Sequence, residues 1–457
     1  MAKFCYWTFR GYLRFVHDKL YYRKTYVVNK ENATPDGVPT LVASNHQNAL
    51  NDPLAVQFSF KRRFVSIFAR ADVLQIPVAG KILKALGLIP AFRLAHEGEE
   101  ALKQNFPIFE EAGSRLIHGH TIAIFPEATN QDRHWLGDFS LGYLRLAFQA
   151  AERDGFKTDI KILPTALHYD NYFSMQSSVV VKYGTAVSLA DYYELYQTKP
   201  RTAQRKVNEI VRKQISDMML NINDTENYEA IDYIRTTYGV RWAQQCGIDP
   251  KYLPSRLDTD KELCAALENL SATQPEVAKQ IFADALELKK ITLEVGTRDW
   301  VFDKKVTANL VFWRCFGLAV TLPLFIISLW PAYFVFKSPN PLTKKFEAKG
   351  GNAKMFIGGA RYVICALVSI PLFWVIAYLL DLSLFNWWIA LIHCALLPVL
   401  SIFAWNYRIY CIKSKGWIRY LKAKNKNEKF RSWITRREQL FNQIENIVKT
   451  YQSDKKV

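Results

Sequence analysis

A histidine and an aspartate six positions apart, His46 and Asp52, are the pair best suited to proton transfer in this sequence. Histidine has an ordinary pKa of about 6.5, so its ring can accept a proton from a hydroxyl near neutral pH. A nearby carboxylate can fix the ring tautomer and stabilise the imidazolium that forms. Pro53 suits a first helical position, which predicts Asp52 as the helix cap and a turn of the chain between the two side chains. The alternative is that Asp52 only caps a helix over 53–60 and that His46 is an ordinary loop histidine.

Three further short signatures follow this pair in order along the chain. They are Gly87-Leu88-Ile89-Pro90-Ala91-Phe92-Arg93, Phe125-Pro126-Glu127-Ala128-Thr129 and Ile162-Leu163-Pro164-Thr165. Each is weak alone. Together with the segment 45–52, and in this order, they resemble the glycerolipid acyltransferase family, which moves a fatty acyl chain from a thioester onto a glycerol-phosphate hydroxyl. The resemblance covers about residues 35 to 190.

The resemblance implies a catalytic pair. His46 is expected to be the general base that takes the proton of the acceptor hydroxyl. In the family the carboxylate partner lies five positions after the histidine, where this sequence has Asn51. We expect Asp52, one residue later, to be the partner, with Asn51 as the alternative.

The resemblance also implies substrate contacts. Arg93 is expected to bind the phosphate, which its planar fork of donors suits. Glu127 is expected to hold a glycerol hydroxyl or to position the acceptor, and Thr129 to donate to the substrate or to cap the next turn. Arg70 lies where the family often has a basic residue and is expected to meet a phosphate of the acceptor or the donor. Ala128 stands where the family usually has glycine, and its methyl group crowds the acceptor site slightly.

Other positions of the signatures are expected to shape the site. They are Asn45, Gly87, Pro90, Pro126 and Pro164. No Gly-x-Ser-x-Gly elbow is present and no cysteine lies in a signature, so direct attack of the hydroxyl on the thioester is expected. No metal or redox cofactor is implied, and acyl-CoA or acyl-carrier protein (acyl-ACP) would be a substrate. The seven scattered cysteines lack zinc spacing and predict a reduced protein that faces the cytosol.

These signatures need elements that bring them together. Short apolar runs predict strands over 41–43, 64–69, 121–125, 160–163 and 179–182, and helical stretches over 53–60, 74–86, 97–118 and 139–153 alternate with them. The alternation predicts an α/β domain with a mixed, largely buried sheet flanked by helices, followed by a helical region and C-terminal transmembrane helices. Ligands of such sheets bind where strands end and loops lead into helices, and each signature falls at or beside such an end.

Composition divides the chain into five parts. Residues 1–34 predict an interfacial amphipathic helix and a lead-in, with a helix packed on its own domain as the alternative. Residues 35–195 are the expected acyltransferase domain, and 196–305 a helical insert or spacer without a chemical motif. Residues 306–405 are the expected transmembrane segments, and 406–457 a basic cytoplasmic tail.

Three apolar segments, roughly 310–336, 362–380 and 384–405, approach the ~20 residues that span a bilayer. The loop 337–361 holds six basic residues against one acidic, and positive charge prefers the cytoplasmic side. We therefore expect a re-entrant first segment, bent near Pro323, and one hairpin, with the catalytic domain, this loop and the tail all inside. Three crossings with the tail outside is the alternative.

The net charge of +18 requires an acidic partner. Residues 406–457 contain 14 Lys and Arg against 4 Asp and Glu and follow directly on an apolar segment, so membrane lipids are the expected partner. No zinc-finger, RNA-binding or helix-turn-helix pattern is present, and nucleic acid is not expected.

The expected function is that of a membrane-bound O-acyltransferase of phospholipid synthesis. It would acylate glycerol 3-phosphate or its 1-acyl derivative from the cytoplasmic face of a membrane, the inner membrane if the source is bacterial. A lysophospholipid remodelling enzyme is an alternative of the same class. A catalytically silent, acyltransferase-like membrane adaptor is the alternative of another class, supported by Asn51 and Ala128. The acceptor, the donor carrier and the oligomeric state stay open.

Overall fold

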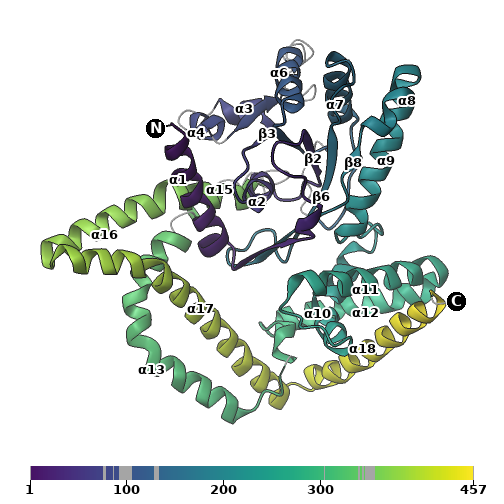
Figure 1. Cartoon of the computed structure of the whole chain (residues 1–457). Coiled ribbons are helices and arrows are strands. Elements are labelled where there is room, and N and C mark those ends of the chain that lie inside the picture. The colour runs from purple at the N-terminus through teal and green to yellow at the C-terminus, as the bar shows by residue number, and fades with distance from the viewer. Residues whose placement is uncertain are drawn as a thin grey trace. The chain divides into compact units, whose positions relative to one another are not determined.

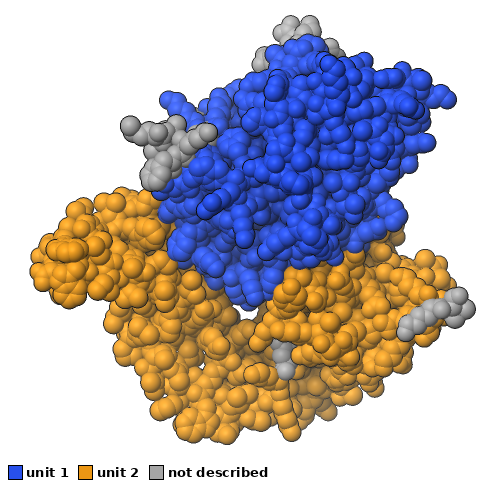
Figure 2. Space-filling model, viewed as in Figure 1, with its two compact units in different colours: residues 1–221, 342–363 blue, residues 222–341, 364–457 orange. Residues whose placement is uncertain are grey.

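The computed structural model describes residues 2–75, 79–85, 87–91, 105–127, 133–302, 304–337, 340–341, 344 and 356–455 (Figure 1). The chain forms two compact units, which Figure 2 distinguishes by colour. The first unit comprises residues 1–221 and 342–363, and the second comprises 222–341 and 364–457. A short piece from late in the sequence therefore belongs to the N-terminal unit.

The first unit is built on a sheet that has eight strands in the described part of the chain. They are β1 (Lys24–Val28), β2 (Thr40–Ser44), β3 (Val65–Arg70), β4 (Leu88–Ala91), β5 (Thr121–Ile124), β6 (Lys161–Tyr169), β7 (Ser178–Tyr183) and β8 (Val187–Ser188). Their order is β1-β7-β6-β2-β5-β3-β4, and β8 pairs with β6. The strands from β6 to β4 run parallel, whereas β7 and β8 run antiparallel to β6. The predicted α/β fold with a mixed sheet is confirmed.

The strands β1 and β4 were not predicted. Both lie at the ends of the sheet and are only partly buried, so neither shows the continuous apolar run of the central strands. β1 extends the sheet N-terminally, although the predicted domain began at residue 35. β1 belongs to the domain because it pairs with β7, which comes much later in the chain.

Helices cover both faces of the sheet. The helices of the first unit are α1 (Ala2–Phe15), α2 (Asn51–Ser59), α3 (Ala71–Leu74), α4 (Ala79–Ala85), α6 (Asn105–Ile117), α7 (Gly142–Arg153), α8 (Tyr193–Thr198) and α9 (Pro200–Met218). One core cluster joins α6, α7 and α9 to β2, β5 and β6. The crossover from β2 to β3 runs along the sheet in the opposite direction to those that contain α6 and α7. Right-handed crossovers in opposite directions lie on opposite faces, so α2 covers the other face.

The N-terminal helix α1 is fastened to α2 by a buried arginine. Arg10, 3% exposed, donates to the carbonyl oxygens of Gln57 at 2.7 Å and Phe60 at 2.6 Å. Arginine at the C-terminal end of a helix satisfies carbonyls that have no partner within the helix. Trp7 and Phe15 of α1 stay exposed, so the helix packs on its own unit and still presents an aromatic surface.

The second unit is helical in its described part. Its helices are α10 (Tyr228–Gln245), α11 (Leu253–Thr273), α12 (Pro275–Glu294), α13 (Ala308–Ala332), α16 (Ile370–Leu384), α17 (Trp387–Lys426) and α18 (Glu428–Asp454), and α15 (Phe356–Ile364) runs into it from the first unit. Arg235 pairs with Asp260 at 3.1 Å between α10 and α11, and both are buried. The ring of Phe441 on α18 packs on Tyr238 with centroids 5.1 Å apart, so α18 completes this bundle.

Three helical stretches are long and apolar enough to cross a membrane. They are Ala308–Lys337, Ile357–Leu384 and Trp387–Lys426. In the first of them the helix continues through Pro323 as far as Lys337, and whether the segment is re-entrant stays a prediction. Figure 1 shows α13 changing direction along its length, as a helix-interior proline favours.

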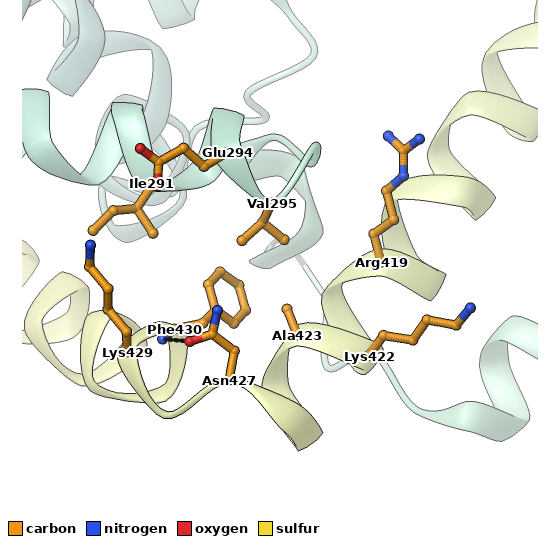
Figure 3. A pocket seen from close by; sticks show the side chains of 9 residues that line it. All are labelled: Ile291, Glu294, Val295, Arg419, Lys422, Ala423, Asn427, Lys429 and Phe430. Carbon is orange, nitrogen blue, oxygen red and sulfur yellow. Dashed lines mark hydrogen bonds between the residues drawn. The ribbon is translucent and has the colours of Figure 1, made fainter.

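A hollow of about 320 Å³ lies where the end of α12 meets the corner between α17 and α18 (Figure 3). The ring of Phe430 and the side chains of Ile291 and Val295 line its centre, and Lys422 and Lys429 stand at its rim. The basic C-terminal helices α17 and α18 thus form an amphipathic hollow together with the end of α12.

Candidate active site

The first and third signatures reach one edge of the sheet, as does the end of β4 in the second, whereas the fourth lies within β6. β2 lies between β5 and β6, all three run parallel, and their carboxyl ends therefore face the same way. His46 follows the end of β2 and Glu127 follows the end of β5, while Arg70 is the last residue of β3. This is the edge at which parallel α/β sheets bind ligands.

His46 and Asp52 are in direct contact. The Nδ1 atom of His46 lies 2.7 Å from Oδ2 of Asp52, and the carboxylate is fully buried. An ionised carboxylate only accepts hydrogen bonds, so Nδ1 carries the proton and donates it. The Nε2 atom is then left with a lone pair, as a general base requires. The His46 side chain is 14% exposed and stacks on Phe125, with ring centroids 4.5 Å apart.

Asp52 is held by three further donors. The backbone N–H groups of Gln47 and Asn48 each donate to Oδ2 at 2.7 Å, and the hydroxyl of Tyr169 donates to Oδ1 at 2.6 Å. Burial of a carboxylate is costly unless donors surround it. These contacts offset that cost and fix the plane of the carboxylate against the His46 ring.

The loop between the two side chains turns in a way that the sequence did not reveal. Ala49 has a φ of 42°, in the left-handed region that non-glycine residues rarely adopt. The helix α2 begins at Asn51, two residues before Pro53, so Asp52 lies in its first turn and the prediction of Asp52 as the cap is wrong. The turn points the Asp52 carboxylate back at the loop. Asn51 instead donates to Oδ1 of Asn48 at 3.3 Å.

Asn45 anchors the start of this loop. Its side chain donates to the carbonyl of Leu167 at 2.9 Å and accepts from the Leu167 N–H at 2.7 Å. β6 extends past the end of β2, and the Asn45 amide continues the ladder where β2 has stopped. The position of His46 is therefore fixed relative to β6.

Glu127 supports the backbone of the catalytic loop. Its Oε1 atom accepts from the N–H of His46 at 2.7 Å, and Oε2 accepts from the N–H of Gly137 at 2.9 Å. Burial raises the pKa of Glu127 to about 7, although the two backbone donors favour its ionised form. In this arrangement Glu127 ties the end of β5 to His46, a role that the sequence did not suggest.

The proline and glycine positions of the signatures lie in the framework. Pro164 is in β6 between the residues that pair with β8 and those that pair with β7, where a missing N–H is tolerated. Pro90 lies in β4 opposite Ala69, and Gly87, with a φ of 92°, leads into that strand. The carbonyl of Pro126 accepts from Ser140 at 3.0 Å.

Two predicted substrate contacts cannot be placed. Arg93 and Thr129 lie outside the described residues, as does Ala128. Arg70 is placed by its backbone, which pairs with Ala91 at the same edge as His46. Within the described ranges, no group of three or more His, Cys, Asp or Glu side chains is arranged to hold a metal ion.

A buried polar group beside the pair was missed. The Tyr172 hydroxyl lies 2.9 Å from Oε1 of Gln47 and 2.9 Å from Nδ1 of His134. The carbonyl of Tyr172 accepts from the Asn48 side chain at 3.2 Å. Tyr172 thus holds the loop through both Gln47 and Asn48. No local spacing signals it, because its partners are 38 and 125 positions away.

The start of the second apolar stretch also packs on the catalytic loop, within the first unit. A Cβ atom on Gly358 would lie 2.9 Å from both Oδ1 of Asn48 and Nδ2 of Asn51, and one on Gly359 would lie 2.9 Å from Cβ of Leu50. Only glycine permits this approach. The pair of glycines ahead of an apolar run is the signal that the sequence offered.

Comparisons with known proteins found similarity to acyltransferases. Residues 24–168 match the model of the family described as Acyltransferase. An uncharacterized acyltransferase of Schizosaccharomyces pombe (strain 972 / ATCC 24843) is 26% identical over 130 residues, which are 28% of this chain and 19% of that protein. The crystal structure of the 1-acyl-sn-glycerophosphate (LPA) acyltransferase PlsC from Thermotoga maritima is similar with a TM-score of 0.35 and 18% identity, over 47% of this chain and 80% of that one. The similarity to the acyltransferase family thus covers residues 24–168. This chain spans about a fifth of the length of the curated relative that it matches.

Proposed function

We propose that this protein is a membrane-bound O-acyltransferase. It transfers a fatty acyl group from acyl-CoA or acyl-ACP to the hydroxyl of glycerol 3-phosphate or 1-acyl-glycerol 3-phosphate. The observation that carries the proposal is the contact of 2.7 Å between His46 Nδ1 and the buried carboxylate of Asp52 at the ligand-binding edge of the sheet. The matched acyltransferase domain supports the class of reaction.

In the proposed step, the acceptor hydroxyl attacks the thioester carbonyl while Nε2 of His46 takes its proton. Asp52 stabilises the imidazolium and keeps its Nδ1–H in place. The tetrahedral intermediate collapses, the C–S bond breaks, and the departing thiolate takes the proton back from Nε2. The products are an ester and a free thiol, and His46 is again neutral.

The other assigned residues complete the proposal. Arg93 and Arg70 would bind phosphate groups, and Thr129 would donate to the acceptor. Glu127 would act through the backbone of His46. We also place the catalytic unit on the cytoplasmic face, because the segments that flank the apolar helices are rich in Lys and Arg.

The test is an assay of the purified, detergent-solubilised protein with palmitoyl-CoA and, separately, glycerol 3-phosphate or 1-acyl-glycerol 3-phosphate. His46→Ala is expected to abolish turnover, whereas His118→Ala, at an exposed histidine directly after α6, leaves it unchanged. Turnover with one acceptor identifies the substrate. Absence of turnover with both acyl-CoA and acyl-ACP would overturn the proposal in favour of a silent adaptor.

A further inference from the structure

The first apolar helix, from Ala308 to Lys337, is long enough to cross a bilayer, but the chain on either side of it restricts where it can lie. The preceding helices α10, α11 and α12 form a charged bundle with a buried ion pair between Arg235 and Asp260. Among the described residues, no candidate span precedes Ala308. The chain therefore reaches α13 on the side of the membrane that holds the catalytic unit.

The chain is back at the catalytic unit by residue 358. The carbonyl of Gly358 accepts from the Tyr21 hydroxyl at 2.8 Å, and Arg361 donates to the carbonyl of Phe173 at 2.7 Å. The Tyr362 hydroxyl donates to the carbonyl of Leu13 at 2.8 Å, and its side chain is buried. These contacts build the start of the second apolar stretch into the same unit as the sheet.

A single crossing by α13 would leave the following residues on the far side of the bilayer, where none of these contacts could form. A helix of 30 residues is about 45 Å long and cannot cross twice. We propose that α13 does not cross. It lies within the leaflet that faces the catalytic unit, and the hairpin of α16 and α17 makes the only two crossings by the described helices.

The C-terminal helix agrees with an even number of crossings. On α18, Arg436 pairs with Asp284 of α12 at 2.9 Å, and Glu438 pairs with Arg241 of α10 at 2.8 Å. The tail is therefore on the same side as the bundle that precedes α13. Three crossings would separate them.

The surface of α13 fits a position within one leaflet. The Arg314 guanidinium lies over the ring of Trp417, 4.2 Å from its centroid, on the basic part of α17 beyond its apolar stretch. In the second half of the helix, Phe334 stacks on Phe373 near the start of α16, with centroids 4.8 Å apart. The first half thus contacts the basic part of α17, and the second half contacts the middle of the hairpin. Exposed apolar side chains of the stretch Ala308–Lys337 include Phe312, Trp313, Phe316, Ile326, Ile327 and Tyr333. A lipid leaflet is the partner that covers such a surface, and aromatic residues and arginine are typical of its boundary.

The test is cysteine labelling of the full chain, freed of its own cysteines, in sealed vesicles with an impermeant maleimide. Single cysteines replace Lys344 after α13, Asn386 at the tip of the hairpin, Ser453 in α18, and Glu152 as a catalytic-unit reference. We expect labelling from one side of the membrane at positions 344, 453 and 152. Position 386 is expected to react from the other side. Reaction of the Lys344 position only from the side opposite Glu152 would show that α13 crosses and would overturn the proposal. Reaction of all four from one side would overturn the two crossings of the hairpin.

A depth measurement keeps the proposal testable if a labelled variant folds poorly. Spin labels at Val320 and Ile326 of α13 are expected to lie at a shallower depth in the bilayer than a label at Val375 of α16. The depth is measured by comparing how often each label collides with oxygen and with a water-soluble nickel complex. Equal depth at Ile326 and Val375 would contradict a position within one leaflet. This result does not depend on turnover, so failure of the inference and failure of the proposed reaction are distinguishable.

Discussion

The hydroxyl of Tyr169, at the end of β6, lies 2.6 Å from Oδ1 of Asp52, whose other oxygen holds the ring of His46. A phenol 117 positions away in the sequence therefore fixes the carboxylate that fixes the proposed base. Burial raises the pKa of the Tyr169 hydroxyl well above its usual value, so this group stays protonated and donates throughout the useful pH range.

Replacing Tyr169 with phenylalanine should therefore impair the site without emptying the core. The variant leaves Oδ1 of Asp52 buried without this hydrogen-bond donor. Loss of such a donor destabilises a buried group by about 1–3 kcal/mol. We expect Tyr169→Phe to lower kcat/KM by about 5- to 100-fold. The control is Tyr143→Phe, which loses a bond of 3.0 Å to Asn208 away from the site and should lower only the Tm. Equal kcat/KM values for the two variants would show that Tyr169 has no positioning role.

The carboxylate of this chain is Asp52, one residue after the position at which the family has it. Substitutions at positions 51 and 52 can test which position supports catalysis. Asp52→Asn removes the charge that stabilises the imidazolium, and kcat should fall by about 10²- to 10⁴-fold. Adding Asn51→Asp puts a carboxylate at the usual spacing, but that side chain points to Asn48. The double variant should therefore stay as slow as Asp52→Asn in steady-state assays. Recovery of activity would mean that the loop can adopt the usual arrangement.

Glu127 should make stability depend on pH. Its pKa is raised by burial from 4.5 to about 7, so between these values the folded protein binds more protons than the unfolded chain. The contribution of Glu127 to stability is thus greatest below pH 4.5 and is lost as the pH rises through 7. We expect the Tm difference between the wild type and Glu127→Gln to shift against the wild type from pH 5 to pH 8. If the Tm of the two proteins changed in parallel with pH, the raised pKa of a buried Glu127 would be contradicted.

The close approach of Gly358 to the catalytic loop predicts a large effect from one methyl group. In Gly358→Ala, the new Cβ would press on the side-chain amides of Asn48 and Asn51, beside the Asn48 N–H that holds Asp52. We expect kcat to fall about 10-fold or more with a smaller change in KM, because the base is misplaced while the substrate contacts are kept. Gly317→Ala in α13, where nothing lies within 4 Å, is the matched control and should retain kcat. A pure loss of stability with unchanged kcat would exclude the positioning role.

The sequence predicted the parts of the site that are local. Strand ends followed by polar signatures were enough to place His46, Asp52 and Glu127 at one edge, because parallel strands end at the same edge whatever the details of packing. The direction in which Asp52 points was not predictable, because it depends on the left-handed Ala49, a residue type with no preference for that conformation.

The residues that contact the catalytic loop from distant positions could not be predicted from the sequence, for a different reason. Tyr169, Tyr172 and Gly358 act on the loop through contacts that span more than a hundred positions, and no periodicity encodes such pairs. The substrate role expected of Glu127 stays a prediction, and its hydrogen bonds to the backbone N–H groups of His46 and Gly137 were not foreseen. The three apolar stretches were recognisable from composition, but the unbroken helix at Pro323 required the structure.

The late position of Gly358 in the chain has a consequence for biosynthesis. A ribosome makes the sheet, the catalytic pair and all of α10 to α13 before it makes the residues that close the loop from Asn48 to Asn51. A nascent chain therefore holds an unfinished site until its apolar helices have begun to enter lipid. Acylation activity would begin only after delivery to the membrane, and a fragment ending at residue 221 would fold around an open loop.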